Sequence, residues 1–598
     1  MKGAFFQDDE ILGSFYDARL IGRVFRFIRP YAGLAVGAVI LVLGGMGLFL
    51  VNPYLLGKVV DIGIKGRDTD AIIRYGIIYG VIECLIFVTA YTQNYLLQYI
   101  GQKVMYDLRS EFFSHLQRLP IPFFDRNPVG RLVSRTTNDI ATLAELFSSG
   151  IVMVIGDLFL IVGIAVTLVA LQPRLGLATL ATVPLLVAAA YFFQSRIRAT
   201  FRDVRVRIAR ITAALSENIS GIKVIQIFNR EESRAAKFDV LNAQHRESQV
   251  ESVFYHSLFM PVITIINALC IVVIILLGGQ MVSAGTLTLG LLVSFLAYAQ
   301  HFFHPIRNLS EKVTIFQSAM ASAERVFKLM DEPEEAGLEE GANPDAIKGE
   351  IRFENVHFSY NSGAEVLHDI SFTVSPGQSV ALVGHTGAGK TTITALLNRM
   401  YDVQGGRILL DGKDLREFAK SGLRKRIAVI HQDVFIFGDT VLDNIRLWNP
   451  EVHPDRVRQI ASDIGADGFI QALPKKYDSE LYERGANLST GQRQLLSFAR
   501  ALCADPNILV LDEATSSIDS ETEKLIQEAI KTLTRGRTSL IIAHRLSTIR
   551  HCDRILVLHK GSLVESGTHE ELLAQRGYYY KLYELQFHDD EQPATSQN

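Results

Sequence analysis

The 598-residue sequence predicts a polytopic α-helical membrane domain followed by an α/β domain. Long apolar windows recur within residues 31–306, and some of the stretches between them are rich in arginine and lysine. Beyond residue 350, short β-type runs alternate with helical runs, which is the pattern of an α/β domain. At roughly 150 residues per domain, the chain is too long for one core. A hydrophobic content of 48% is high for a soluble protein, and we expect the excess in the N-terminal half.

The apolar windows are long enough to cross about 30 Å of hydrocarbon at about 1.5 Å per residue. We predict six spans, at residues 31–52, 72–98, 148–171, 175–194, 254–278 and 285–306. The turn Gln-Pro-Arg separates the third span from the fourth, and the uncharged run GGQMVSAG separates the fifth from the sixth. Each of these two pairs is therefore expected to form a hairpin with a tight outer loop.

Basic residues gather before the first span and in the two long stretches that follow the second and fourth spans. They are Arg19, Arg23, Arg26 and Arg29, then Lys103, Arg109, Arg118, Arg126, Arg131 and Arg135, then Arg196, Arg198, Arg202, Arg205, Arg207, Arg210, Lys223, Arg230, Arg234, Lys237 and Arg246. The positive-inside rule places these stretches and the N-terminus in the cytoplasm. An even number of spans then returns the C-terminal domain to the cytoplasm.

The two long basic stretches contain few helix breakers, so we expect the spans to continue through them as long cytoplasmic helical rods. A 25-residue extension would reach about 35–40 Å beyond the membrane. If these stretches only fixed the topology, their charges would be explained but their length would not. We therefore favour rods that couple the membrane domain to the C-terminal domain.

The predicted domains are a membrane domain at residues 1–330, a linker at 331–350, an α/β domain at 351–587 and a disordered tail at 588–598. The linker, DEPEEAGLEEGANPDAIKGE, is rich in Pro, Gly and acid, and we expect a solvated connection without chemistry. The net charge of -3 argues against nucleic acid as a partner. The four cysteines are far apart and form no CxxC pair, which argues against a disulfide scaffold and a zinc site.

A phosphate-binding loop stands at the start of the α/β domain. The strand-type run SVALVG leads into GHTGAGKT, residues 384–391, and then into the helical run TTITALLNRM. Glycines let backbone N–H groups turn toward phosphate oxygens, the Lys390 ammonium adds charge at the β- and γ-phosphates, and the Thr391 hydroxyl can ligate Mg²⁺. The expected nucleotide-binding residues here are Gly384, His385, Thr386, Gly387, Ala388, Gly389, Lys390, Thr391 and Thr392. A chance match is the alternative, but the strand and helix context favours an α/β P-loop nucleotide-binding domain with Mg²⁺ as a cofactor.

Two acids follow a second apolar strand, in NILVLDEATSSID. Asp512 is placed to hold the Mg²⁺ shell, and Glu513 is placed to orient or deprotonate an attacking water. One acid at a strand end is often a helix cap. Two acids in series downstream of a P-loop favour hydrolysis over binding alone.

With these residues identified, the chain resembles the ATP-binding cassette (ABC) transporter superfamily, in particular exporter half-transporters with one six-helix membrane domain fused to one cassette. The resemblance covers nearly the whole chain. The segment LRSEFFSHLQRLPIPFFDRNPVGRLVSRTTNDI is similar to the family's first cytoplasmic coupling region, and SENISGIKVIQIFNRE is similar to the second.

The resemblance also implies roles for single residues in the cassette. Tyr360 matches the tyrosine that stacks on adenine, Gln432 matches the glutamine that contacts the metal and senses the coupling rods, and Asp519 matches the D-loop acid. His544 matches the switch histidine that contacts the γ-phosphate. The segment ERG at 483–485 is similar to the loop that contacts a coupling helix in exporters. Taken singly, these residues would more often be structural, and it is their order along the chain that favours the functional roles.

The run LSTGQ occupies the position of the family's LSGGQ signature. It comprises Leu488, Ser489, Thr490, Gly491 and Gln492. The resemblance implies a head-to-tail pair of cassettes, in which this helix N-terminus caps the γ-phosphate held by the other subunit's P-loop. Thr490 replaces the usual glycine, and a β-branched residue tolerates unusual backbone angles poorly and crowds a phosphate. In heterodimeric exporters of this family, one composite site commonly pairs an altered signature with a partner whose acid after the Walker B aspartate is also altered, whereas Glu513 and His544 are intact here. The resemblance therefore favours the hydrolytically competent half of a heterodimer, with a homodimer as the alternative.

The activity implied by the resemblance is ATP-driven export of a small or amphipathic substrate by alternating access, by a multi-pass protein of a bacterial inner membrane. An ATP-gated channel or regulator is the alternative from another class, and intact Glu513 and His544 argue against it. Glu83 and Asp157 fall inside predicted spans, where a charge costs about 2.5–3.5 kcal/mol. Either residue could line a cavity for cationic amphiphiles, with Gln93, Asn94 and Asn267, or could form interhelical hydrogen bonds.

Overall fold

The computed structural model describes residues 18–344, 347–360, 363–512, 520–543 and 546–587. The chain divides into two compact units. Met1–Gln117 and Val129–Glu332 form the first, which we call the membrane unit, and Arg118–Pro128 and Pro333–Asn598 form the second, which we call the α/β unit. The short segment Arg118–Pro128 therefore belongs with the C-terminal part of the chain, although it lies within the predicted membrane domain.

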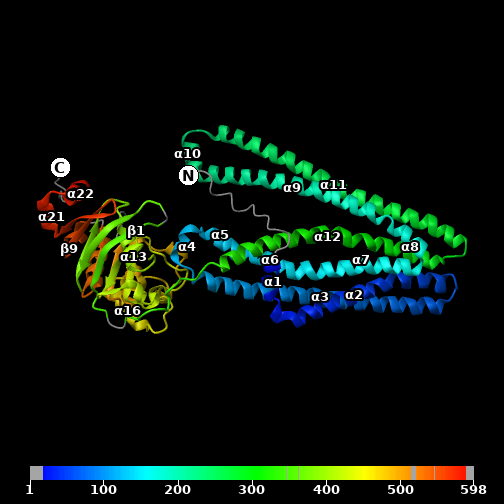
Figure 1. Ribbon diagram of the computed structural model, residues 1–598, viewed down its shortest axis with the longest axis horizontal. Helices are drawn as coiled ribbons and strands as arrows, with labels where there is room; N and C mark the ends of the chain where they lie inside the picture. Colours follow the sequence, from blue (N-terminus) through cyan, green and yellow to red (C-terminus); the bar gives the residue numbers. More distant parts are fainter. Residues whose placement is uncertain (1–17, 345–346, 361–362, 513–519, 544–545, 588–598) are drawn as a thin grey trace. The chain divides into compact units, whose positions relative to one another are not determined.

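The described part of the membrane unit consists of helices and the turns between them, and its helices lie along one another (Figure 1). Its elements are α1 (Ala18–Arg26), η1 (Arg29–Tyr31), α2 (Ala32–Lys58), η2 (Val59–Ile64), α3 (Thr69–Leu116), α5 (Val129–Ser134), η3 (Arg135–Asp139), α6 (Ile140–Glu145), η4 (Leu146–Gly150), α7 (Ile151–Leu171), α8 (Pro173–Leu180), α9 (Val183–Ser220), α10 (Ile222–Ile227), α11 (Glu231–Ser283) and α12 (Leu289–Met330). Several of these elements run on without a break, since the π-helical turns η2, η3 and η4 continue their neighbours.

Among the described residues, five helical stretches are long and apolar enough to cross a membrane. They are Arg29–Ile64, Thr69–Leu116, Val129–Leu171, Pro173–Ser220 and Glu231–Ser283. Each contains one of the first five predicted spans, which are thereby confirmed in length and composition. The sixth predicted span falls in α12, whose apolar part is the shorter run Leu289–Phe302.

The predicted loop between the fifth and sixth spans is wrong in its position. Helix α11 continues to Ser283, so most of the run GGQMVSAG is helical. Gly278 lies at a helix contact, where an added Cβ would come 2.5 Å from Leu292 Cδ1. Gly285, with φ of 72°, makes the turn, and the next N–H, of Thr286, donates to Met281 O at 2.9 Å. The pair is still a hairpin, but its loop is shorter than predicted.

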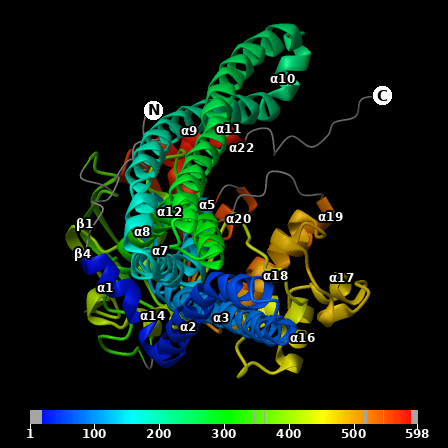
Figure 2. The same cartoon turned by 90° about the vertical axis from the view of Figure 1, so that its right-hand side faces the viewer.

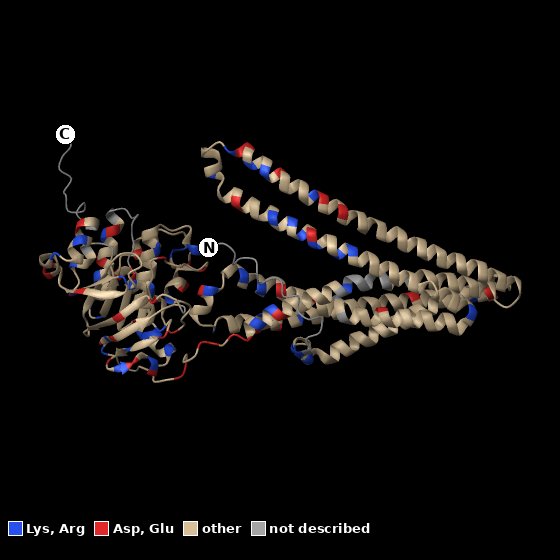
Figure 3. Ribbon diagram, turned by 45° about the horizontal axis from the view of Figure 1, so that its top comes forward, with Lys and Arg blue, Asp and Glu red and all other residues tan. Residues whose placement is uncertain are grey.

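Helices α9 and α11 lie side by side and are joined by the short α10 (Figure 2). Lys, Arg, Asp and Glu gather toward the α10 end of this hairpin, and the remainder is almost free of charge (Figure 3). Helix α11 alone has 53 residues, which corresponds to about 80 Å at about 1.5 Å per residue. The hairpin is thus much longer than a bilayer core, and the predicted rods are confirmed as continuous helices.

The α/β unit contains two sheets. Its strands are β1 (Ile351–Phe358), β2 (Leu367–Val374), β3 (Ser379–Val383), β4 (Gly405–Leu410), β5 (Lys413–Asp414), β6 (Ile427–Ile430), β7 (Ile508–Asp512), β8 (Thr538–Ile542), β9 (Arg554–His559) and β10 (Ser562–Gly567). Its helices and helical turns are α4 (Ile121–Arg126), α13 (Lys390–Leu397), η5 (Leu415–Glu417), α14 (Lys420–Arg426), α15 (Val441–Arg446), α16 (Pro454–Asp463), α17 (Asp467–Gln471), η6 (Lys476–Asp478), η7 (Glu483–Gly485), α18 (Thr490–Cys503), α19 (Ser520–Thr534), α20 (Leu546–Arg550), α21 (His569–Gln575) and α22 (Tyr578–Phe587). The antiparallel sheet has the order β2-β1-β4-β5, and the larger sheet has the order β10-β9-β3-β8-β7-β6.

The larger sheet is buried on both faces. Along β7, Ile508 and Val510 pack into one apolar cluster, and Leu509 and Leu511 pack into the cluster on the other face. Strands β6, β7, β8, β3 and β9 pair in parallel, so their carboxyl ends lie at one edge of the sheet. Ligands of open α/β sheets bind at this edge. The topology therefore brings together the carboxyl ends of β3, β6, β7 and β8, and most of the predicted site residues follow these strands in the sequence.

Most described residues of the predicted linker, 331–350, are exposed, but two places in the segment are bound to the folded α/β unit. The Glu335 carboxylate, 8% exposed, accepts two hydrogen bonds from Arg424 at 2.7 and 2.9 Å and one from Lys420 at 3.3 Å. These contacts attach the segment to α14. A sequence rich in acid and glycine is typical of a solvated connection, but here a basic helix neutralises the acid.

The second half of the same segment is bound to the smaller sheet. The backbone N–H groups of Lys348, Gly349 and Glu350 donate to the Asp411 carboxylate at 2.7, 3.1 and 2.8 Å. Ile347 is buried in the core beside them. Residues 347–350 therefore lead directly into β1 as part of the folded unit.

Candidate functional site

The predicted site residues fall at the ends of strands and in the first turns of helices. The loop that connects β3 to α13 comprises Gly384, His385, Thr386, Gly387, Ala388 and Gly389, and the first turn of α13 contains Lys390, Thr391 and Thr392. The segment before α18 contains Leu488 and Ser489, and the first turn of α18 contains Thr490, Gly491 and Gln492. Tyr360 follows β1, Gln432 follows β6, and Asp512 ends β7. Glu513, Asp519 and His544 lie outside the described residues. Their predicted roles stay predictions.

The loop between β3 and α13 has the backbone of a phosphate cradle. Gly387 and Gly389 have φ of 83° and 101°, a region that residues with a side chain rarely adopt. A Cβ on Gly389 would also lie 2.5 Å from Leu367 Cδ2. Gly389 is the N-cap of α13, so the loop ends on the unpaired N–H groups of a helix N-terminus. This arrangement binds anions.

Lys390 lies within this loop. Its ammonium donates to Gly384 O at 2.5 Å and to His385 O at 3.2 Å, and the side chain is 6% exposed. Burial lowers the pKa of Lys390, and the nearby Asp512 carboxylate opposes this shift. The end of β7 is thus close enough to the P-loop for its carboxylate to act on the lysine. A hydroxyl at Thr391 and a carboxylate at Asp512 are the oxygen ligands that Mg²⁺ prefers.

Two T-shaped ring contacts and a hydrogen bond from its hydroxyl group position Tyr360. Its ring centroid lies 5.0 Å from that of Phe358, with the planes at 85°, and 5.0 Å from that of Tyr401, at 88°. The Tyr360 hydroxyl forms a 3.0 Å hydrogen bond with the hydroxyl of the buried Thr392, in the first turn of α13. The residue is 40% exposed, so the ring offers a fixed surface beside the P-loop.

Gln404 holds the backbone that carries this ring. Its Oε1 accepts a hydrogen bond from Ser359 N at 2.8 Å, and its Nε2 donates to Ser359 O at 2.7 Å. Both backbone groups of the residue before Tyr360 are therefore bound by one side chain. No sequence motif marks Gln404 or Tyr401, because their role depends on the pairing of β1 with β4.

The signature segment opens α18 with a capping box. Ser489 Oγ accepts from Gln492 N at 3.2 Å, and Gln492 Oε1 accepts from Ser489 N at 3.0 Å. Thr490 follows with the right-handed backbone of the first helical turn. The expectation that Thr490 would meet unusual backbone angles is therefore wrong, and the expectation that it crowds a phosphate stays a prediction.

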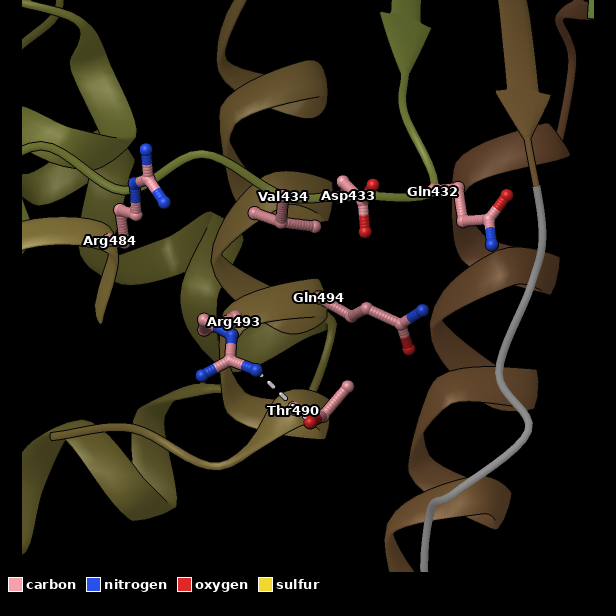
Figure 4. Close-up of a pocket in the computed structure, with 7 residues that line it drawn as sticks. All are labelled: Gln432, Asp433, Val434, Arg484, Thr490, Arg493 and Gln494. Atoms are coloured by element: carbon pink, nitrogen blue, oxygen red, sulfur yellow. Dashed lines mark hydrogen bonds between the residues drawn. The ribbon is translucent and has the colours of Figure 1, made fainter. Parts of the chain in front are cut away.

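The Thr490 side chain is tethered. Arg493 Nη2 donates to Thr490 Oγ1 at 3.1 Å, and Arg493 Nη1 donates to Leu488 O at 3.0 Å. Both side chains line a polar cavity of about 280 Å³, together with Gln432, Asp433, Val434, Arg484 and Gln494. Figure 4 shows Gln432, Gln494 and Thr490 extending to the same side of the signature helix. Sequence analysis identified Gln432 and Thr490 but missed Arg493.

The structure thus assembles the predicted residues in two groups. The P-loop, Tyr360 and Asp512 form the first, and the signature segment forms the second. Gln432 follows β6 at the sheet edge where β7 ends in Asp512, and it also lines the cavity beside Thr490. Among the described residues, no hydrogen bond connects residues 384–392 with residues 488–492. Each group offers a helix N-terminus to an anion.

Comparison with known families identifies both units. The family model of the ABC transporter transmembrane region matches residues 34–306, and the ABC transporter model matches residues 367–516. The first match begins within the first predicted span and ends with the sixth. The second runs from β2, through the P-loop and signature segment, and past Asp512.

Several similar proteins match the chain over most of both lengths. The chain is 39% identical to the "Uncharacterized ABC transporter ATP-binding protein YknV" of Bacillus subtilis (strain 168) over 98% of this chain and 97% of the relative. It is 39% identical to the "Fatty acid ABC transporter ATP-binding/permease protein" of Mycobacterium tuberculosis (strain CDC 1551 / Oshkosh) over 82% and 78%. It is 33% identical to YgaD of Bacillus subtilis (strain 168), a candidate multidrug export ATP-binding/permease protein, over 94% and 99%.

The site geometry and the comparisons agree. A P-loop and a signature helix stand in one α/β unit, and long apolar helices precede that unit in the same chain. The chain matches its relatives across both parts. It therefore belongs to the ABC transporter family, as an integral membrane, exporter-type, ATP-hydrolysing transporter with its transmembrane region and its ATPase domain fused in one polypeptide.

Proposed function

We propose that this chain exports a small or amphipathic substrate by alternating access and works as one half of a dimer. The observation that carries this proposal is that one chain holds two anion-binding helix N-termini, those of α13 and α18. Among the described residues, the P-loop and the signature segment of one chain share no hydrogen bond. Two chains arranged head to tail would complete two ATP sites, each with a P-loop from one chain and a signature from the other.

Within each site, this chain's residues would divide the work. Lys390 would neutralise the β- and γ-phosphates, and Thr391, Gln432 and Asp512 would hold Mg²⁺, which supplies charge neutralisation at the transferred phosphoryl group when bound. Tyr360 would stack on adenine. For the residues outside the described ranges, we propose that Glu513 orients or deprotonates the attacking water, that His544 contacts the γ-phosphate, and that Asp519 acts at the cassette interface.

Glu513→Gln tests the catalytic assignment. The substitution keeps the size of the side chain and removes its basicity, so ATP binding should remain while turnover is lost. Phosphate release and nucleotide affinity measured on the same purified protein separate the two effects. Near-normal phosphate release would remove Glu513 from its proposed role.

The α10 end of the α9–α11 hairpin supports the coupling role proposed for the rods. Ile227 and Phe228 are 74% and 68% exposed at this end, between two strongly charged helices. Ile219, Ile222 and Val224 are exposed as well, and a group of exposed apolar side chains with polar neighbours is typical of a contact surface. We propose that this end contacts a cassette and carries the closure of the cassettes to the spans. ATP favours closure because it binds one state better than the other.

The partner is either a different half-transporter, which gives a heterodimer, or a second copy of this chain, which gives a homodimer. The heterodimer proposal rests on Thr490 as a weakened signature beside intact Glu513 and His544. The ordinary backbone and tethered hydroxyl of Thr490 favour the second candidate, a homodimer, because neither indicates a damaged signature.

Complementation within a homodimer distinguishes the two. Lys390→Ala disables the P-loop, and Thr490→Asp places a carboxylate where the phosphate of the other subunit would bind, on an exposed helix position that tolerates it. In a homodimer, each variant alone would have two defective sites. A mixed dimer would have one intact site, so mixing should restore ATP turnover. No restoration would favour the heterodimer.

Two acidic side chains in the predicted spans are candidates for substrate contact. Glu83 Oε1 accepts a 2.7 Å hydrogen bond from Asn52 Nδ2, between α3 and α2, and Glu83 stays exposed. Asp157, in α7, is partly buried. We propose amphipathic cargo, in line with relatives named for fatty acids or multidrug export. If Glu83 and Asp157 select cations, neutralising both should lower cation transport more than basal ATPase, whereas equal losses would refute this role.

We further propose a bacterial inner membrane, with the N-terminus and the cassette in the cytoplasm. The basic stretches and the bacterial relatives support this orientation and location. A gated channel remains the alternative from another class. Substrate flux and phosphate release measured together in proteoliposomes distinguish the two. Flux against the substrate gradient that depends on ATP hydrolysis would support a pump, and downhill flux without phosphate release would support the channel.

A further inference from the structure

Tyr401 touches both Tyr360 and α4 (Ile121–Arg126). Its ring lies edge-on to that of Tyr360, with the centroids 5.0 Å apart and the planes at 88°. Its hydroxyl donates a hydrogen bond to Asp125 Oδ2, on α4. Helix α4 belongs to the same compact unit as the cassette and lies between α3 and α5 in the chain. One side chain therefore contacts the ring proposed for adenine and the segment that connects two membrane helices.

Tyr401 is placed to move with Tyr360 rather than independently of it. Tyr401 and Gln404 come from one four-residue segment, and Gln404 binds both backbone groups of Ser359. Tyr401 also meets Phe358, with centroids 5.6 Å apart. A change in the position of Tyr360 would therefore reach Tyr401 through the ring contact and through the backbone of its own segment.

The hydrogen bond from Tyr401 to α4 persists over the physiological pH range. Burial and the hydrogen bond to Asp125 both raise the pKa of the Tyr401 phenol above its ordinary value, although nearby Arg126 opposes them. The phenol therefore stays protonated and can donate to the Asp125 carboxylate.

We propose that Tyr401 is a positioning residue that transmits the stacking of adenine on Tyr360 to α4 through Asp125. The inference rests on the adenine-stacking role proposed for Tyr360. A base stacked on the exposed face of Tyr360 restricts that ring, and the edge contact then fixes Tyr401 and its hydrogen bond to α4. A polyphosphate without a base would occupy the P-loop and leave this contact unchanged.

The experiment compares a nucleotide with a base-free anion on the full-length protein in nanodiscs. Hydrogen–deuterium exchange of peptides covering residues 118–128 is measured with a non-hydrolysable ATP analogue and with inorganic tripolyphosphate, each at saturation. Tyr401→Phe removes the hydrogen bond and keeps the ring, and Asp125→Asn weakens it from the other side. Tyr477→Phe is the matched control, since Tyr477 Oη donates to Asp467 Oδ1 at 2.7 Å elsewhere in the cassette.

In the wild type, the analogue should slow exchange in these peptides by about threefold more than tripolyphosphate does. Tyr401→Phe and Asp125→Asn should remove most of this difference, with analogue affinity kept within about twofold of wild type. Tyr477→Phe should keep the full difference. Full retention in both Tyr401→Phe and Asp125→Asn, or equal protection by tripolyphosphate and the analogue, would overturn the proposal.

Tyr360→Ala separates failure of this inference from failure of the proposed function. Loss of an aromatic stacking contact should weaken analogue affinity by about 2- to 10-fold. If Tyr360→Ala weakens affinity while Tyr401→Phe leaves the α4 response intact, the transmission through Tyr401 is wrong. If Tyr360→Ala leaves affinity unchanged, the adenine-stacking role of Tyr360 is wrong, and the proposal fails with it.

Discussion

Removal of the Glu335 carboxylate tests whether residues 331–350 are part of the folded α/β unit. Glu335 and Lys420 are each 8% exposed at the side chain, and Arg424 is 28% exposed. Glu335→Ala would leave two cations without their shared carboxylate in a largely buried place. Removing one partner of a buried ion pair costs about 3–5 kcal/mol. Because Arg424 keeps some access to water, we expect the lower end, about 3 kcal/mol.

A unit of this size shifts its melting temperature by about 2 °C per kcal/mol, so the transition of the α/β unit should fall by about 6 °C. Differential scanning calorimetry of the purified full-length protein measures this shift. Glu334→Ala is the matched control, because Glu334 approaches Arg118 at 3.7 Å with both side chains about half exposed, and such pairs contribute about 0–1 kcal/mol. If Glu335→Ala shifts the transition no more than Glu334→Ala, the segment is a solvated connection after all.

Three further predictions follow from the same structure. The arginine and lysine beside Glu335 hold its pKa below the ordinary value despite burial. Its contribution to stability is therefore complete at neutral pH and is lost as pH falls through the lowered pKa. The difference in melting temperature between wild type and Glu335→Gln should narrow on acidification, and a constant difference would contradict this. Gly389→Ala should weaken nucleotide affinity by about tenfold or more, because φ is 101° and Leu367 occupies the space; Gly468→Ala, an exposed helical site with nothing within 4 Å, should leave affinity unchanged. Thr490→Gly should change ATP turnover by less than about threefold if Thr490 does not crowd the phosphate; a rise of about tenfold would show that it does.

Much of the membrane unit follows from the sequence because the bilayer imposes length and apolarity on each span. The wrong prediction in this unit, the position of the loop between the fifth and sixth spans, depended on the roles of two glycines. Gly278 and Gly285 stand at the two ends of the run GGQMVSAG, but Gly278 packs against Leu292 and only Gly285 makes the turn. A glycine required for close packing and one required for a turn look alike in a sequence.

The P-loop and the strand that ends at Asp512 could also be predicted, because the phosphate cradle depends on local backbone chemistry. Tyr401, Gln404 and Arg493 could not be predicted in the same way. Tyr401 acts through contacts with residues far away in the sequence, Asp125 and Tyr360, and no local pattern encodes such a contact. The contacts of Glu335 in the predicted linker could not be predicted for the same reason, because its partners on α14 lie more than 80 residues further along the chain.

The central proposition is that each ATP is bound between two polypeptides, by the P-loop of one and the signature helix of the other. Mass photometry and phosphate release measured on the same preparation, over a dilution series, test it most directly. The account predicts that turnover per chain falls in step with the fraction of particles that contain two half-transporters. Full turnover by particles of a single chain would contradict it.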